Sequence, residues 1–274
     1  MGLCDLHIHS FYSDGTFSPA EIVEKAGEKN LCAISITDHD EVDAIGVARS
    51  YGEKRNIRVI AGVELSAIYK DIEIHILGYL FDENEKRLQA KLSEMRVYRE
   101  ERARKILSKL RDYGFNIKFD LVIKLAGRGA IGRPHIAQAM LEQKAIFNYK
   151  EAFTKYIGNG KPCNVPKYRL DPEEVIALIK DADGIPVLAH PANIRDYGIV
   201  DELLNFPFAG IEVWHPDHTS QQIKNYLTIA EDKSLLVTGG SDSHGDIPTK
   251  ALIGGIEVDS SIVDSLIDYK NTYL

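Results

Sequence analysis

The sequence of 274 residues is poor in cysteine, has fewer basic than acidic residues, and contains no long apolar stretch. Three scattered cysteines without a C-x-x-C pair argue against a disulfide framework or a thiolate zinc site, and they favour a reducing cytoplasm. With 33 Lys and Arg against 41 Asp and Glu, the net charge is −8, which excludes nucleic-acid binding through bulk charge. The longest uncharged run, residues 184–194, is too short to span a membrane, and the N-terminus does not resemble a secretory signal. We therefore expect no membrane partner, and the sequence identifies no protein partner.

Short apolar runs alternate with helical stretches, which is typical of an α/β fold with a mostly parallel sheet. Eight strands are expected, at residues 4–9, 32–38, 58–65, 72–80, 185–190, 210–215, 235–240 and 253–258. Ser18-Pro19 and Asp171-Pro172 each place a capping side chain before a proline, so we expect helices to begin there.

The alternation stops between residues 81 and 166, which we interpret as a helical insertion. Four helices are expected within it, at residues 83–112, 120–126, 133–142 and 149–157. The chain would then consist of a first barrel part at 1–80, the inserted lid or substrate domain at 81–166, and a second barrel part at 167–274. The first of these helices has ten Lys or Arg and six Asp or Glu, a net charge of +4. A solvated face with ion pairs explains this charge, and so does a lid that favours an anionic substrate.

Histidine and acidic residues recur at the ends of the expected strands. His7 and His9 form an H-x-H pair whose side chains share one face of the first strand. Seven further residues lie on or directly after later strands or loops: Asp14, His39, Glu64, His75, His190, Asp242 and His244. A lone strand histidine is usually a hydrogen-bonded core residue, but charges gathered at the active-site end of a barrel need a compensating cation. The joint pattern therefore predicts a multinuclear metal site.

The expected ligands are imidazoles and carboxylates without a thiolate, which suits Mn, Fe or Zn. Nine ligands exceed the needs of one ion, so two or three divalent ions bridged by a carboxylate are expected. Closely spaced ions of this kind clamp a phosphoryl group and generate hydroxide near neutral pH.

Five segments resemble, in order, the motifs of the PHP (polymerase and histidinol phosphatase) superfamily: DLHIHS at 5–10, SDG at 13–15, ITDHD at 36–40, GVE at 62–64 and GSDSH at 240–244. The resemblance covers both ends of the chain and leaves out the helical block. It implies a distorted (β/α)7, TIM-like barrel with an inserted small helical domain. It also implies phosphoester hydrolysis at a trinuclear site, for which we expect manganese before zinc or iron.

The resemblance also implies a role for each ligand. One ion would be held by His7, His9, Glu64 and Asp242, a second by Glu64, His75 and His190, and a third by Asp14, His39 and His244. Some relatives have histidine where this chain has Asp14. We expect Asp38 and Asp40 to orient ligands or the neighbouring loop instead of binding metal.

Two softer motifs, GRPHIA at 132–137 and VWHPDH at 213–218, resemble the branch that acts on nucleotides. Its members include nucleoside 3′,5′-bisphosphate phosphatases and 5′-to-3′ exoribonucleases acting on short RNA. The resemblance implies a small phosphorylated substrate, best a nucleoside 3′,5′-bisphosphate that loses its 3′-phosphate, with short 5′-phosphorylated RNA as a related substrate.

Candidate substrate and acid residues lie in or near these motifs. Arg128 and Arg133 flank a glycine-rich turn and can grip phosphate, or they are solvated arginines of a surface turn. His135 contacts substrate or caps the helix that begins there. His215 and His218 are candidate donors to the leaving ribose oxygen, and an exposed loop position explains His218 equally well.

Three alternatives stay open. The chain could be a phosphatase for another small metabolite, such as histidinol phosphate or a sugar phosphate. It could be an amidohydrolase-like enzyme that cleaves C–N bonds, although the arginines and the basic helix favour a phosphate ester. It could also be a non-catalytic metal- or nucleotide-binding module, against which the complete ligand set argues. We expect a cytoplasmic, metal-dependent phosphoric ester hydrolase.

Overall fold

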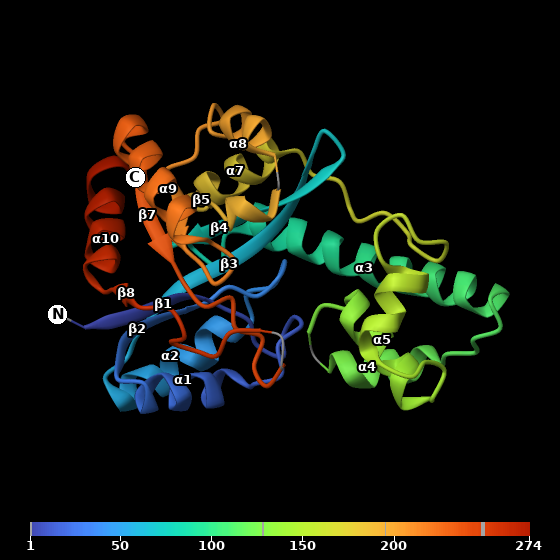
Figure 1. Cartoon of the computed structure of the whole chain (residues 1–274). Coiled ribbons are helices and arrows are strands. Elements are labelled where there is room, and N and C mark those ends of the chain that lie inside the picture. The colour runs from blue at the N-terminus through green and yellow to red at the C-terminus, as the bar shows by residue number, and fades with distance from the viewer. Residues whose placement is uncertain (1, 128, 195, 248–249) are drawn as a thin grey trace.

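The computed structural model describes residues 2–127, 129–194, 196–247 and 250–274, and its centre is an eight-stranded sheet curved into a nearly closed barrel (Figure 1). The strands are β1 (Leu3–Ile8), β2 (Leu31–Ile36), β3 (Arg58–Tyr69), β4 (Ile72–Tyr79), β5 (Ile185–Leu188), β6 (Gly210–Trp214), β7 (Leu236–Gly239) and β8 (Val258–Asp259). Their order in the sheet is β7-β6-β5-β4-β3-β2-β1-β8. The chain after β7 returns to β1 through a bridge between Ser243 and Ile8, and the N–H of His9 donates to the carbonyl of Ser243 at 2.8 Å. The expected barrel with a helical insert is confirmed.

The sheet is mostly parallel, as the sequence predicts, with two exceptions. Strand β4 is antiparallel to both β3 and β5, and the short β8 is antiparallel to β1. The strand expected at 253–258 is wrong over 253–257, where the chain is a loop. Ile253 is 3% exposed because it packs against the core around β1 and α1, so its apolar character reflects burial and not strand pairing.

Helices cover the outside of the barrel: α1 (Pro19–Glu28), α2 (Ala44–Arg55), α7 (Pro172–Asp181), the 3-10 turn η2 (Pro191–Ile194), α8 (Tyr197–Leu203), α9 (Ser220–Lys233) and α10 (Ser261–Tyr273). Helices α1 and α7 begin at the prolines that the sequence marks. The Ser18 hydroxyl accepts the N–H of Glu21 at 3.2 Å, and the Glu21 carboxylate accepts the N–H of Ser18 at 2.8 Å.

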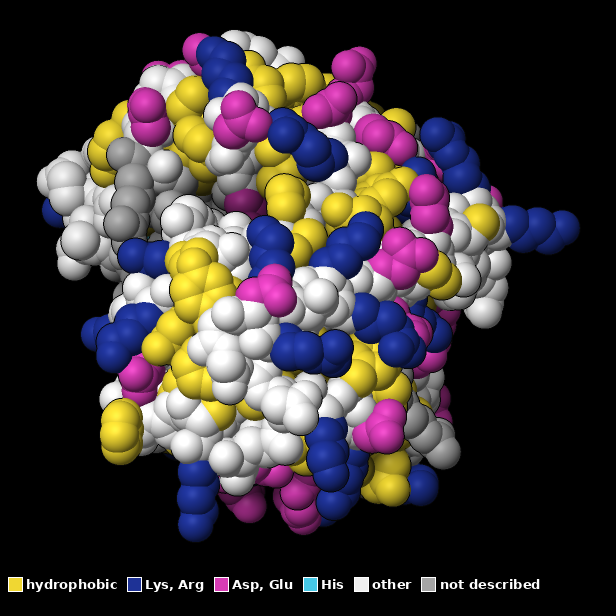
Figure 2. Space-filling view, turned by 90° about the vertical axis from the view of Figure 1, so that its right-hand side faces the viewer, with side chains coloured by type: hydrophobic (Ala, Val, Ile, Leu, Met, Phe, Trp, Pro, Cys, Tyr) yellow, Lys and Arg dark blue, Asp and Glu magenta, His cyan; other side chains and the backbone are white. Residues whose placement is uncertain are grey.

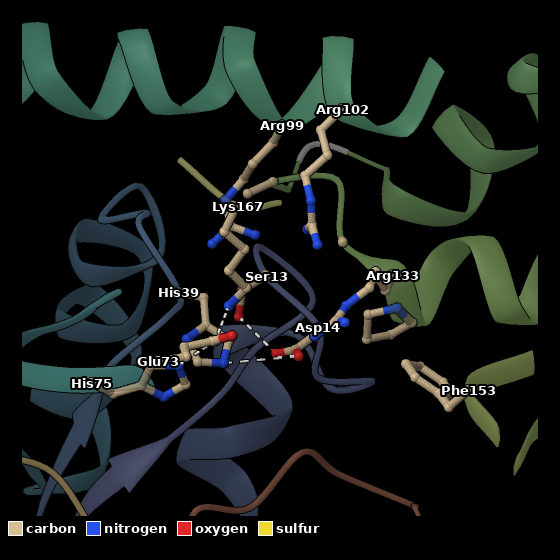
Figure 3. A pocket seen from close by; sticks show the side chains of 13 residues that line it. Ser13, Asp14, His39, Glu73, His75, Arg99, Arg102, Arg133, Phe153 and Lys167 are labelled. Carbon is tan, nitrogen blue, oxygen red and sulfur yellow. Dashed lines mark hydrogen bonds and ion pairs between the residues drawn. The ribbon is translucent and has the colours of Figure 1, made fainter. Parts of the chain in front are cut away.

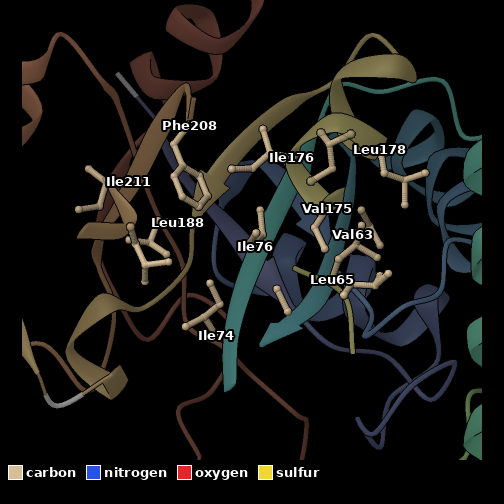
Figure 4. Close-up of a cluster of buried hydrophobic side chains, with 14 of the residues drawn as sticks. Val63, Leu65, Ile74, Ile76, Val175, Ile176, Leu178, Leu188, Phe208 and Ile211 are labelled. Carbon is tan, nitrogen blue, oxygen red and sulfur yellow. The ribbon is translucent and has the colours of Figure 1, made fainter. Parts of the chain in front are cut away.

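Side-chain alternation along the strands separates the core from the barrel interior. Val63 and Leu65 on β3 pack outward under α7, where Val175 and Ile176 meet them (Figure 4). Each such buried side chain stabilises the fold by about 1.5–3 kcal/mol. Because successive strand residues point to opposite faces, the same packing turns Glu64 into the barrel.

The insertion contains α3 (Lys86–Asp112), α4 (Phe119–Ala126), α5 (Arg133–Glu142), α6 (Tyr149–Glu151) and the π-helix η1 (Ala152–Ile157). Figure 1 shows α3 running from the barrel out to the far end of the insertion. Its first half packs on the barrel core through Leu92 and Met95, whereas its second half shares a separate core with α4 and α5. The helix expected at 149–157 is one α-turn followed by a π-helix. The boundaries at 81 and 166 stay a prediction.

Among the described residues, no helix carries an apolar stretch of the length that a membrane crossing requires.

Candidate active site

The nine predicted ligands converge at one end of the barrel interior. They come from β1 or the loop after it (His7, His9, Asp14), from the segment after β2 (His39), from β3 and β4 (Glu64, His75), and from the segments after β5 and β7 (His190, Asp242, His244). They form four overlapping groups, in each of which the candidate ligand atoms lie within 4.8 Å of one another. The fold therefore gathers residues that are up to 237 positions apart, as His7 and His244 are.

Glu64 lies at the centre of the cluster and is 1% exposed. Its Oε2 atom is 3.1 Å from His9 Nε2 and 3.1 Å from His39 Nδ1. Its Oε1 atom is 2.8 Å from His75 Nδ1 and 2.9 Å from His190 Nε2. The two oxygens face two separate sets of imidazoles, which is the arrangement that a bridging carboxylate requires.

Asp242 lies beside His7 and His9, whereas Asp14 lies beside His39 and His244. Asp242 Oδ1 is 3.1 Å from His9 Nε2 and 3.6 Å from His7 Nε2. Asp14 Oδ1 is 3.3 Å from His244 Nε2, and its Oδ2 is 3.9 Å from His39 Nε2. The geometric groups also place His39 with Glu64 and His75, and His7 with Glu64 and His190, so the assignment of ligands to individual ions stays a prediction.

The donor set fits divalent metal ions. Among the described residues, the buried nitrogens of His9, Nε2 of His7, Nδ1 of His39 and Oε2 of Glu64 have no hydrogen-bond partner, although they face one another. Buried polar atoms are normally paired, so this convergence indicates ligands for a cation. Burial lowers the pKa of His9, but the Asp242 and Glu64 carboxylates outweigh it and raise the pKa to about 10.

Two residues of the cluster have positive backbone φ angles, and a glycine beside it allows close backbone packing. His190 and Asp242 have φ of 25° and 48°, a region that residues other than glycine rarely occupy and that occurs preferentially at functional sites. A Cβ atom on Gly240 would collide with the backbone nitrogen of His7, so glycine lets the segment 240–244 lie directly against β1.

Asp38 contacts the loop after β1, Asp40 contacts β3 and α3, and neither belongs to the candidate ligand groups. Asp38 accepts the N–H and hydroxyl of Ser10 at 2.7 and 2.6 Å and the hydroxyl of Ser13 at 2.5 Å. It thereby fixes the loop that carries Asp14. Asp40 accepts the N–H of Ser66 at 3.1 Å and pairs with Arg99.

Glu212 on β6 is a buried carboxylate beside the cluster that sequence reasoning missed. Its Oε1 lies 2.9 Å from His7 Nδ1, and its Oε2 accepts the N–H of His190 at 2.7 Å. Burial would raise the pKa of Glu212, but His7 overrides it and lowers the pKa to about 2. An ionised carboxylate at this position directs the free Nε2 of His7 toward the cluster.

Next to the cluster lies a cavity of about 200 Å³ that is lined by four cations, Arg99, Arg102, Arg133 and Lys167 (Figure 3). Asp14, His39 and His75 form its floor, so the cavity opens directly onto the ligand cluster. Arg99 pairs with Asp40, and Lys167 pairs with Glu73, which also accepts from His75 Nε2 at 2.9 Å.

Two of these four cations face the cavity without an anionic partner. Arg102 donates to the carbonyl of Val165 at 2.8 Å, and Arg133 donates to Asn159 Oδ1 at 2.7 Å. Neither contacts a carboxylate in the described part of the chain. Burial, together with Arg133 and Arg99, lowers the pKa of Arg102 to about 10, as expected where positive charge lacks compensation.

The cationic lining has partial signals in the sequence. Arg99 and Arg102 are three residues apart and therefore share a face of α3. Glu73 is two residues before His75 and shares its face of β4. The block 81–166 has 18 Lys or Arg and 10 Asp or Glu, a net charge of +8 in a chain of net −8. Figure 2 views this end of the molecule and shows Lys and Arg side chains across its middle.

Of the three predicted substrate residues, one lines the cavity, one caps a helix and one lies outside the described residues. Arg133 lines the cavity, whereas Arg128 lies outside the described residues. His135 Nδ1 accepts the N–H of Gly132 at 3.0 Å, so it caps the start of α5, and its contact with substrate stays a prediction.

The two candidate acids lie at different depths. His215 Nε2 is 3.5 Å from Asp242 Oδ2 and thus borders the cluster. His218 packs behind it, with ring centroids 5.2 Å apart, and donates from Nδ1 to the carbonyl of Val213 at 2.8 Å. The interpretation of His218 as an exposed loop histidine is wrong, because it is 8% exposed. It is buried because α9 places Tyr226 against its ring.

Comparison with known proteins agrees with this geometry. The family model of the PHP domain matches residues 5–185, which include six of the nine predicted ligands and the early motifs. The chain belongs to the PHP family. A solved structure described as a putative metal-dependent phosphoesterase from Bifidobacterium adolescentis superposes with a TM-score of 0.88 at 30% identity, covering 97% of this chain and 95% of that one. This PHP protein is accordingly a metal-dependent phosphoesterase.

Three curated relatives have related but distinct names. A phosphoribosyl 1,2-cyclic phosphate 1,2-diphosphodiesterase of Eggerthella lenta is 28% identical over 246 residues, 88% of this chain and 94% of the relative. A 3′,5′-nucleoside bisphosphate phosphatase of Chromobacterium violaceum is 31% identical over 251 residues, which cover 89% of this chain and 88% of the relative. A 5′-3′ exoribonuclease of Haemophilus influenzae is 31% identical over 245 residues, which cover 88% of this chain and 89% of the relative.

Proposed function

We propose that this PHP phosphoesterase hydrolyses the 3′-phosphate of nucleoside 3′,5′-bisphosphates, with short 5′-phosphorylated RNA as a related substrate. The observation that carries the proposal is the cationic cavity beside the ligand cluster, where Arg102 and Arg133 have no carboxylate partner among the described residues. Cations without a carboxylate partner are stabilised by an anionic ligand, and a guanidinium group matches a phosphate in a bidentate fashion. The name of the Chromobacterium violaceum relative supports the same substrate class.

The position of the cationic cavity directly beside the ligand cluster favours a substrate with two phosphates. The cluster would hold the phosphate that is hydrolysed, and the cavity, which shares Asp14, His39 and His75 with it, would hold the second. A monophosphate could fill one site only. The substrate's second phosphate thus supplies binding energy that orients the first one for reaction.

His7, His9, Asp14, His39, Glu64, His75, His190, Asp242 and His244 would hold the metal ions. When bound, divalent ions of this kind polarise a phosphoryl oxygen and lower the pKa of water to the neutral range. Arg102 and Arg133 would bind the second phosphate, and Lys167 would contribute charge from the cavity wall.

His215 is the better placed proton donor for the leaving ribose oxygen. The N–H of Asp217 donates to His215 Nδ1 at 3.1 Å, so in the neutral ring the proton resides on Nε2. This atom faces the cluster next to Asp242. His218 supports the His215 ring from behind.

The test is phosphate release in the presence of Mn²⁺ from adenosine 3′,5′-bisphosphate, 3′-AMP and histidinol phosphate. We expect release from the bisphosphate with 5′-AMP as product, and a much lower kcat/KM for 3′-AMP, which lacks the second phosphate. Equal turnover of the two nucleotides would contradict a second-phosphate site. Turnover of histidinol phosphate alone would overturn the nucleotide assignment. In a parallel assay, turnover of phosphoribosyl 1,2-cyclic phosphate alone would instead assign the activity named for the Eggerthella lenta relative.

A further inference from the structure

The cationic cavity is too small to hold a whole nucleotide. Its volume of about 200 Å³ lies below the roughly 300–1,000 Å³ of typical small-molecule sites. It suits a phosphate group and part of a sugar, so the remainder of a nucleotide has to lie against the rim.

Aromatic side chains of the insertion form one part of this rim. Phe153 on η1 lines the cavity on the side of Arg133 and Asp14 (Figure 3). Its ring is partly exposed, with one part packed against the insertion core. Tyr149, one turn earlier and 37% exposed, has its ring centroid 5.4 Å from that of Phe153. Burial and the Asp14 carboxylate raise the pKa of Tyr149 to about 12.

The local backbone fixes these rings relative to the cavity. Phe153 belongs to a π-helix, a rare conformation that occurs frequently at functional sites. A Cβ on Gly158 would collide with the carbonyl of Phe153, so the glycine permits the close packing with which this segment ends. Arg133 donates to the carbonyl of Ile157 at 3.4 Å and to Asn159 at 2.7 Å. One of the two unpaired cavity arginines is therefore tied to the segment that carries Phe153.

We infer that Phe153, with Tyr149 beside it, is the base-stacking platform of the substrate site and determines preference for nucleotides over other phosphate esters. Aromatic rings bind any base through its π-face, so the platform selects for the presence of a base and not for its identity. The inference rests on the proposed function, because it assigns the part of the nucleotide that the cations and the ligand cluster leave unrecognised.

The experiment compares two substrates that differ only in the base: adenosine 3′,5′-bisphosphate and its base-free analogue, methyl riboside 3,5-bisphosphate. The readout is the ratio of their kcat/KM values with Mn²⁺. Phe153→Leu keeps apolar packing against the insertion core and removes the ring, and Phe153→Trp restores a ring. The matched control is Phe147→Leu, the same change in the same insertion at a side chain that is 96% exposed and outside the cavity.

We expect Phe153→Leu to lower the ratio by about fivefold or more, Phe153→Trp to restore most of it, and Phe147→Leu to leave it unchanged. A wild-type preference for the nucleotide that survives in Phe153→Leu would overturn the platform while leaving the proposed function intact. A wild-type enzyme that hydrolyses both compounds equally well, or neither, would instead overturn the nucleotide assignment itself. Equal thermal unfolding midpoints of the variants and the wild type exclude misfolding as the cause of a loss.

Discussion

Replacing Glu212 by Gln tests whether this buried carboxylate sets the protonation of the metal site. Glu212 is fully buried and accepts from two groups at once, the Nδ1–H of His7 and the backbone N–H of His190. A glutamine has only one oxygen. If that oxygen keeps the bond to His190, the amide NH₂ faces His7 Nδ1, which must then accept, and the His7 proton moves to Nε2. If the amide flips, its NH₂ meets the N–H of His190.

Either orientation has a measurable consequence. A proton on Nε2 removes His7 from the ligand set, and changes in groups that orient ligands typically weaken metal affinity or activity by about 10–100-fold, or about 1.4–2.8 kcal/mol. The flipped amide leaves two buried donors facing each other, which costs about 1–3 kcal/mol of stability. We therefore expect metal affinity to fall by about tenfold or more, with folding retained.

The assay is equilibrium dialysis against buffered Mn²⁺, followed by elemental analysis, with chemical denaturation of the metal-free protein in parallel. Glu231→Gln, the same substitution at an exposed position on α9, serves as the matched control. A folded Glu212→Gln variant that binds Mn²⁺ with wild-type affinity and stoichiometry would refute the role assigned to Glu212 and to the His7 tautomer.

Three further predictions concern the site. Glu64→Gln should abolish stoichiometric metal binding and turnover, since an amide NH₂ would face imidazole ligands; wild-type metal content would contradict this. Arg102→Ala should raise KM for the bisphosphate about tenfold or more, measured by phosphate release, while Arg87→Ala, an exposed position on the same helix, should not; equal KM values would remove Arg102 from the phosphate site. Metal affinity should rise with pH, because in the metal-free protein carboxylates raise the pKa of His9 from 6.5 to about 10. The proton on His9 stabilises the metal-free fold below pH 6.5, and this stabilisation is lost as pH rises toward 10. Calorimetry that finds equal affinity at pH 6.5 and 8.5 would refute the proton competition.

The ligand cluster could be predicted because its residues follow a local rule. His7 and His9 share a face of one strand by their spacing, and Glu64 alternates with Val63 and Leu65, so period-two patterning places all three in the barrel. Helical spacing of apolar residues predicted α3 to within three residues, and α5 lies at its expected bounds.

Local patterns failed where burial or backbone geometry depends on distant segments. Residues 253–258 suggested a strand, although the chain is a loop up to residue 257 and Ile253 is buried by packing against the core. His218 looked like a loop residue, yet α9 covers it. Glu212 alternates with Ile211 and Val213, as Glu64 does with its neighbours, but its contacts with His7 on β1 and His190 after β5 depend on where the fold places β6.

The sequence by itself determined which side chains face the barrel interior, since strand and helix periodicities are properties of the local chain. It also determined the chemistry of the metal ligands through their imidazole and carboxylate types. Only the tertiary structure decided which cations meet those ligands. Arg102 and Arg133 come from separate helices of the insertion, and they share a cavity with Asp14 because α3 crosses the end of the barrel and the loop at Ala130 hydrogen-bonds to Tyr12. Whether these side chains meet depends on packing between segments that are far apart in the chain, and the local spacing of residues does not predict it.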